Sequence, residues 1–262
     1  QIFTLSASPL VDAVYYFEEH PAGNTDSLDI ASQITQTRYI RDTLGFKGDG
    51  IKIGQVEEGR PNITSANFTP SKTYHDSSGS ISSHASMVAY IMVGKGGIVP
   101  NATLYSTTTE RSGGWMAGIE WLLTQGVNVI NISNSLSNAN AQNYGVDARW
   151  IDHIAIQHDV HVVIATGNAG YDRMADAAFA ANVISVGGLD DNNSLTLSDD
   201  TAVPSSSHMT YGRYKPDICA PSVGIDTPIP YEYDSGTSFA APQVTAAVAQ
   251  LCQQNALFKT RQ

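Results

Sequence analysis

Residues 234–242, which read DSGTSFAAP, contain the strongest signal for chemistry in the sequence. Gly236 lies two residues before Ser238, and small residues suited to a helix follow. This spacing allows a tight turn into a helix whose first turn carries Ser238, where the backbone amide dipoles favour a developing negative charge. The pattern predicts either a nucleophilic serine or an ordinary serine that caps a helix.

Three other segments carry side chains that could cooperate with such a serine. His84 follows a loop rich in serine and glycine and opens an apolar helical pattern, Asn168 lies in the string VIATGNAG, and Glu57 and Glu58 end the string IKIGQVEEG. A histidine can act as a general base, a carboxylate can orient it, and an asparagine amide can stabilise an oxyanion. Taken singly, each residue has a simpler interpretation: a capping histidine, a turn-forming asparagine and a pair of solvated carboxylates.

Short runs rich in valine and isoleucine alternate with helical patterns from residue 50 onward. The predicted strands cover residues 51–56, 102–106, 127–132, 160–164 and 183–186, and the predicted helices cover residues 83–93, 114–125 and 148–158. This alternation predicts an α/β fold, a three-layer structure in which a parallel β-sheet carries helices on both faces. Active sites of such sheets gather at the carboxyl ends of the strands, which is where Glu57 and Asn168 fall.

Composition excludes several classes of function. The formal net charge of −11 over 262 residues argues against nucleic acid as a partner. No apolar run reaches the roughly 18 to 20 residues of a membrane span. Cys219 and Cys252 are too few for a disulfide framework and lack metal-site spacing, so we expect buried thiols, with a single bridge between them left open.

The four segments together resemble the motifs of the subtilisin-like serine proteases and occur in the same order along the chain. The string GTSFAAP is similar to the segment that carries the nucleophile of this family, and the resemblance extends over residues 48–251. It implies that Ser238 is the nucleophile and that His84 is the general base. It also implies that Asn168, together with the backbone N–H of Ser238, donates to the oxyanion.

The third member of the triad departs from the family pattern. Glu57 stands where the family has an aspartate, and Glu58 stands at the position of a serine or threonine. A glutamate keeps the charge and can accept from the imidazole of His84, but its extra methylene must be absorbed, and a displacement of about 1 Å can cost about 10²-fold in rate. The resemblance therefore implies a triad of Glu57, His84 and Ser238, and leaves open that Glu57 marks a lapsed or specialised catalyst.

The resemblance also places a substrate pocket. Ser133, Asn134 and Ser135 follow the strand predicted at residues 127–132, where the family has its substrate-binding segment, and Gly167 would form the opposite wall of the P1 pocket. The alternative for these residues is a polar loop after a buried strand. The floor of the pocket, expected within residues 170–182, cannot be identified, although Tyr171, Asp172 and Met174 are candidates.

The resemblance implies a serine endopeptidase that hydrolyses peptide bonds of peptide or protein substrates through an acyl-enzyme. A pro-segment or a protein inhibitor is a further possible partner, and the family implies a secreted or cell-surface location. One alternative is a catalytically weak pseudoprotease that binds peptides or partner proteins. Another is a peptidase that passes its acyl group to an amine, although no insertion suited to excluding water is evident.

The sequence and the same resemblance also give expectations for domain organisation and cofactors. We expect residues 1–23 to be an N-terminal extension of uncertain role, with a short helix at residues 10–19, and residues 24–262 to form one subtilisin-like catalytic domain. Residues 29–44 predict an amphipathic helix that ends at Gly45. No cofactor and no metal are expected, because the loop at residues 92–97, where many family members bind calcium, contains no carboxylate.

Overall fold

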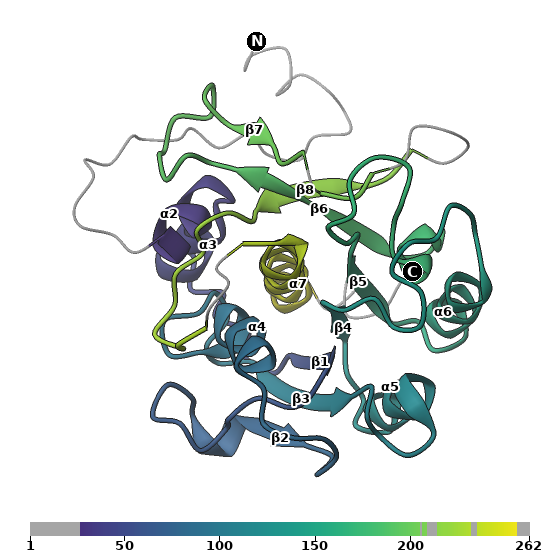
Figure 1. The fold of residues 1–262 in the computed structure, drawn as a ribbon. Coiled ribbons are helices and arrows are strands. Elements are labelled where there is room, and N and C mark those ends of the chain that lie inside the picture. Colours follow the sequence, from purple (N-terminus) through teal and green to yellow (C-terminus); the bar gives the residue numbers. More distant parts are fainter. Residues whose placement is uncertain (1–26, 205, 209–213, 232–234, 256–262) are drawn as a thin grey trace.

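A central β-sheet lies between two layers of helices (Figure 1) in the computed structural model, which describes residues 27–204, 206–208, 214–231 and 235–255. The strands are β1 (Lys52–Glu57), β2 (Thr73–His75), β3 (Thr103–Thr108), β4 (Val129–Ile132), β5 (His161–Ala165), β6 (Ile184–Asp190), β7 (Thr201–Ala202) and β8 (Ile218–Pro221). Their order is β2-β3-β1-β4-β5-β6-β7, and β8 also pairs with β6. These strands pair in parallel, except that β7 pairs with β6 antiparallel, so the predicted α/β fold is confirmed.

The helices pack against both faces of the sheet. They are α2 (Ser27–Ile34), α3 (Thr37–Asp42), α4 (Ser83–Val93), α5 (Gly114–Thr124), α6 (Val146–Gln157) and α7 (Thr237–Gln254), with 3-10 turns η1 (Pro70–Lys72) and η2 (Asp176–Phe179). Helices α2, α3, α4 and α7 lie on one face, and α5 and α6 on the other (Figure 1). Each face has its own apolar core. Helix α4 is buried from its third residue onward, which is typical of a helix enclosed by its neighbours.

The predicted strands and helices after residue 50 are all present, with ends that shift by a few residues. Strands β2, β7 and β8 were not predicted. They contain three, two and four residues, and both residues of β7 are exposed. Such short segments carry too little hydrophobic alternation to be recognised from sequence.

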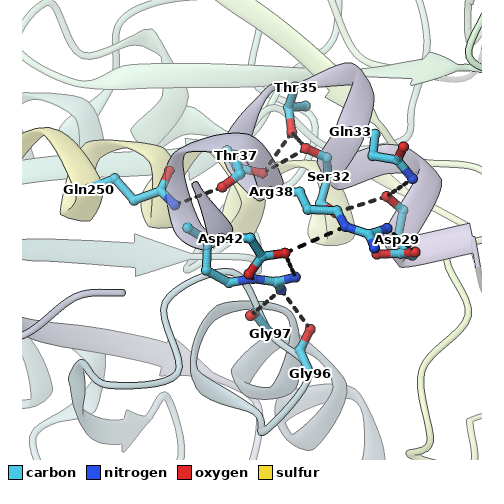
Figure 2. Close-up of polar contacts among 11 residues, drawn as sticks. Asp29, Ser32, Gln33, Thr35, Thr37, Arg38, Asp42, Gly96, Gly97 and Gln250 are labelled. Carbon is cyan, nitrogen blue, oxygen red and sulfur yellow. Dashed lines mark hydrogen bonds and ion pairs between the residues drawn. The ribbon is translucent and has the colours of Figure 1, made fainter. Parts of the chain in front are cut away.

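The prediction of one helix over residues 29–44 is wrong. The segment forms α2 and α3, and Gln36 between them has a left-handed φ of 62°. The hydroxyl of Thr35 donates to the backbone carbonyl of Ala31. The hydroxyl of Thr37 donates to the backbone carbonyl of Ser32 (Figure 2). In a continuing helix the carbonyl of Ser32 would accept from the backbone N–H of Gln36. Here it accepts from the hydroxyl of Thr37, and the N–H of Gln36 donates to the carbonyl of Gln33, so the helix ends at this point.

Two further expectations concern the termini and the cysteines. The predicted extension at residues 1–23 and its helix at residues 10–19 lie outside the described residues. Cys252 is buried as expected, but Cys219 is exposed, because the first half of β8 is open to solvent. The thiol of Cys219 is free, so the bridge to Cys252 is not formed. No helix in the described part of the chain is long and apolar enough to cross a membrane.

Candidate active site

The predicted site residues meet at one edge of the sheet. Glu57 is the last residue of β1, Ser133 follows β4, and Gly167 and Asn168 follow β5. These three strands are parallel neighbours, so their carboxyl ends lie side by side. Helix α7, which packs against β4 and β5, begins at the same edge with Ser238 as its second residue. The fold therefore gathers residues from distant parts of the chain.

Glu57 and His84 form a hydrogen-bonded pair. The Nδ1 atom of His84 lies 3.1 Å from Oε2 of Glu57, whose side chain is fully buried. His84 is held in the first turn of α4, which is capped by the hydroxyl of Ser82 accepting from the backbone N–H of Ala85. The extra methylene of the glutamate is thus accommodated within hydrogen-bonding distance of the imidazole. The second oxygen, Oε1, is buried and has no hydrogen-bond partner among the described residues.

The environment of His84 favours the protonated imidazole. Burial of the ring lowers its pKa, but the negative charge of Glu57, the hydrogen bond to it and the nearby charge of Glu58 together outweigh burial, so the pKa lies above the ordinary value of 6.5. The rings of Tyr231 and Phe239 also pack near the imidazole, each with its centroid 5.6 Å away. These contacts restrict the positions that the imidazole can adopt.

Ser238 lies at the start of α7 behind a backbone turn that requires glycine. Gly236 has a φ of 143°, which L side chains rarely adopt, and an added Cβ would lie 3.3 Å from Nδ2 of Asn168. The hydroxyl of Ser238 donates to the backbone carbonyl of Ser133 at 3.0 Å. The side chains of His84 and Ser238 both lie in the described part of the chain, and they form no hydrogen bond with each other. Catalytic hydrogen bonds often form only when substrate is bound.

Asn168 lies beside the turn that precedes Ser238. Its Oδ1 accepts from the backbone N–H of Thr237 at 3.0 Å and from the hydroxyl of Thr237 at 3.3 Å. That hydroxyl in turn accepts from the backbone N–H of Gly167 at 3.1 Å. Because Oδ1 is fixed in this way, the Nδ2 group is the part of the carboxamide that can donate to a developing oxyanion.

A pocket of about 190 Å³ opens next to Ser238. It is lined by Ser133, Asn134, Ser135, Ala139, Asn140, Ala165, Gly167, Asn168, Ala169, Thr237 and Ser238. All four residues predicted for the substrate pocket therefore line a single cavity. None of the three floor candidates, Tyr171, Asp172 and Met174, is among the lining residues.

The similarity to known proteins agrees with this geometry. The sequence model of the subtilase family matches residues 24–262. The chain belongs to the subtilase family. It is 28% identical to the alkaline elastase YaB of Bacillus sp. (strain YaB) over 82% of its own length and 58% of the elastase. It is also 28% identical to an alkaline protease of Alkalihalobacillus alcalophilus, over 96% of the chain and 67% of the protease.

A solved structure shows the same fold. The prenylagaramide maturation protease PagA superimposes with a TM-score of 0.65 at 23% identity, over 81% of this chain and 79% of PagA. The chain thus spans somewhat more than half the length of the elastase, and most of PagA.

Some features of the site in this subtilase were not found from the sequence. Ala139 and Asn140 line the pocket but occur in a polar loop that matches no motif. Tyr231 lies near His84 from a loop with no recognisable pattern, whereas Phe239 was part of the GTSFAAP string and could have been noticed. No group of three or more His, Cys, Asp or Glu side chains suited to a metal ion occurs in the part of the chain that the structure describes.

Proposed function

We propose that this subtilase is a serine endopeptidase that hydrolyses peptide bonds of peptides or proteins through an acyl-enzyme. The observation that carries the proposal is the hydrogen bond between buried Glu57 and His84, at the strand edge where α7 presents Ser238. A buried carboxylate that accepts from a histidine Nδ1 is the arrangement that fixes an imidazole as a general base.

The proposed reaction follows from these positions. Ser238 attacks the carbonyl carbon of the peptide bond while Nε2 of His84 takes its proton, and Glu57 stabilises the imidazolium. Asn168 Nδ2 and the backbone N–H of Ser238 donate to the oxyanion of the tetrahedral intermediate. The imidazolium then protonates the leaving amine, and water activated by His84 releases the acyl group from Ser238.

The hydrogen bond from Ser238 to the carbonyl of Ser133 favours a second candidate. In that state the hydroxyl does not face the general base, as expected for a catalytically weak pseudoprotease that binds peptides or partner proteins. In an active enzyme, substrate would release this hydroxyl toward His84. The similarity to an alkaline elastase and an alkaline protease supports activity. A secreted or cell-surface location, and control by a pro-segment or inhibitor, belong to the same proposal.

Hydrolysis of internally quenched peptides tests the two candidates. The parent chain is expected to cleave, and Ser238→Ala is expected to abolish cleavage, because it removes the hydroxyl that would form the acyl-enzyme. Ser235→Ala is the matched control: it removes an exposed serine from the same turn and should retain activity. A parent chain that binds these peptides but does not cleave them would favour the pseudoprotease.

A further inference from the structure

The pocket beside Ser238 is uncharged but polar. Its lining consists of glycine, alanine, serine, threonine and asparagine, with no acidic, basic or aromatic side chain. A charged side chain entering it would lose water without meeting an opposite charge, which is costly. The pocket therefore disfavours lysine, arginine, aspartate and glutamate at the position that it binds.

Several of the polar lining groups are already committed to the protein. The hydroxyl of Ser133 accepts from Nδ2 of Asn131. The carboxamide of Asn134 donates to the carbonyl of Val56 and accepts from the backbone N–H of Leu136. Together with Asn168, whose Oδ1 is held by Thr237 and whose Nδ2 is the proposed oxyanion donor, these groups shape the cavity and its walls.

Two lining side chains remain available. Neither the hydroxyl of Ser135, which is partly buried, nor the carboxamide of Asn140, which is exposed at the pocket wall, has a hydrogen-bond partner in the described part of the chain. Both residues line the pocket, so a bound side chain would displace water from them. A carboxamide contains both a donor and an acceptor, and a hydroxyl can act as either. The pair can therefore bind a partner that also contains a donor and an acceptor.

The loop that carries these two residues is held in place. Asn140 donates its backbone N–H to Oδ1 of Asn138, and the next residue, Ala141, exchanges two backbone hydrogen bonds with Met174, of 2.8 and 3.0 Å. Earlier in the loop, the backbone N–H of Ser137 donates to the buried carboxylate of Asp147. Because the wall is fixed before substrate arrives, binding to it costs little ordering.

We propose that this pocket selects an uncharged hydrogen-bonding side chain at P1, the carboxamide of glutamine or asparagine, with Asn140 and Ser135 as the specificity-determining residues. The inference rests on the proposed peptidase function. An apolar side chain of similar size would fill the cavity but would cover Asn140 and Ser135 without pairing them. Leaving such groups desolvated and unpaired is what penalises the wrong substrate.

Pairs of quenched peptides that differ only at P1 test the inference. Glutamine and methionine have similar size and flexibility, so their comparison isolates hydrogen bonding. We expect kcat/KM to be at least about tenfold higher for glutamine than for methionine, the effect of one or two hydrogen bonds. Peptides with lysine or glutamate at P1 are expected to be cleaved more slowly than the glutamine peptide.

Substitutions assign the selectivity to named residues. Asn140→Leu is expected to remove most of the preference for glutamine and to raise the relative rate for methionine. Asn140→Asp should favour lysine, because it supplies the missing opposite charge. Asn143→Leu is the matched control, because Asn143 is an exposed asparagine of the same loop that does not line the pocket. This variant should prefer glutamine over methionine at P1 as strongly as the parent chain does.

The outcomes separate the inference from the proposed function. Cleavage of the methionine peptide as fast as the glutamine peptide by the parent chain would overturn the inference and leave the peptidase intact. If Asn140→Leu and Asn143→Leu lost the preference for glutamine to the same extent, Asn140 would not be a specificity-determining residue. If the parent chain cleaves no peptide in the set, both the inference and the proposed function fail.

Discussion

Glu57 places a charged oxygen against His84 from the end of a strand, in a site where neither residue has much freedom. One oxygen accepts from the imidazole, and the other is buried without a partner in the described residues. A buried carboxylate with so few hydrogen bonds is costly. The interaction with His84 therefore offsets the cost of burying this charge. Because the same interaction raises the pKa of His84, that pKa is the quantity to measure.

The first prediction concerns Glu57→Gln. Because the charge of Glu57 raises the pKa of His84, the substitution should lower that pKa, and the acidic limb of the profile of kcat/KM against pH should move to lower pH. The base is the neutral imidazole, so in both proteins activity rises as pH increases through this pKa. The rate itself should fall by about 10⁴-fold, because a neutral amide can hold the wrong tautomer of the histidine.

Glu58→Gln is the control for that measurement. Glu58 is exposed and only adds to the shift, so its removal should move the limb slightly and leave kcat nearly unchanged. Titration of the imidazole of His84 by NMR gives the pKa directly. An unchanged pKa in Glu57→Gln would show that Glu57 is not the partner of His84.

At the residue scale, the sequence yields candidates where a role depends on residue type. Serine, histidine and asparagine in family-like strings made Ser238, His84 and Asn168 candidates, and Glu57 followed from register; the structure brings the four to one edge of the sheet, and their roles stay predictions. The contact of Ser238 with Ser133 could not be predicted, because its acceptor is a backbone carbonyl that any residue would present. Asn140 was missed because it reaches the pocket through a loop path that has no periodicity.

At the scale of elements, the strands and helices that could be predicted are those with a long or clear apolar pattern. Strands β1, β4 and β5 are short buried runs with Val and Ile, and helix α4 is a longer apolar run. Glu57 ends β1, His84 lies in α4, and Asn168 follows β5. The break between α2 and α3 depends instead on side-chain hydroxyls that compete for backbone carbonyls. Such local competition is not visible in hydrophobic spacing.

The loop after α4 gives a prediction at this scale. Arg41, in the last turn of α3, donates from Nη1 to the carbonyl of Gly97 at 2.9 Å and to that of Gly96 at 3.3 Å. Both glycines are labelled in Figure 2. Calcium needs several oxygen ligands, usually including carboxylates, and this loop has no carboxylate and two carbonyls bound to a guanidinium. The residues therefore do not fit the calcium site that many family members have here.

We accordingly expect a chelator such as EDTA to leave the thermal midpoint of unfolding unchanged. Arg41→Ala should lower that midpoint, because it leaves the two glycine carbonyls without this donor and detaches α3 from the loop. Differential scanning calorimetry of both proteins, with and without EDTA, makes the comparison. A fall of several degrees on adding EDTA to the parent chain would contradict this interpretation of the loop.

At the scale of the whole molecule, the fold joins parts of the chain that no local pattern connects. Two apolar cores hold the sheet between its helices, and α7 lies between the sheet and the helices of one face (Figure 1). Ser238 is the second residue of α7, at the strand edge that holds the candidate site. The net charge of −11 has no counterpart in the pocket, whose lining is neutral. The acidity is therefore not concentrated at the pocket. Besides Glu57, the buried acidic residues of the described chain lie elsewhere in the fold, at Asp147, Asp152, Asp176 and Asp191.

The proposed peptidase activity depends above all on Ser238 acting as a nucleophile activated through His84 and Glu57. Mass spectrometry after reaction with a fluorophosphonate tests this most directly. We predict one adduct per chain, located on the peptide that contains Ser238, absent from Ser238→Ala and formed much more slowly by Glu57→Gln. An adduct that persists in Ser238→Ala, or that forms at another residue of the parent chain, would contradict the assignment of Ser238 as the nucleophile.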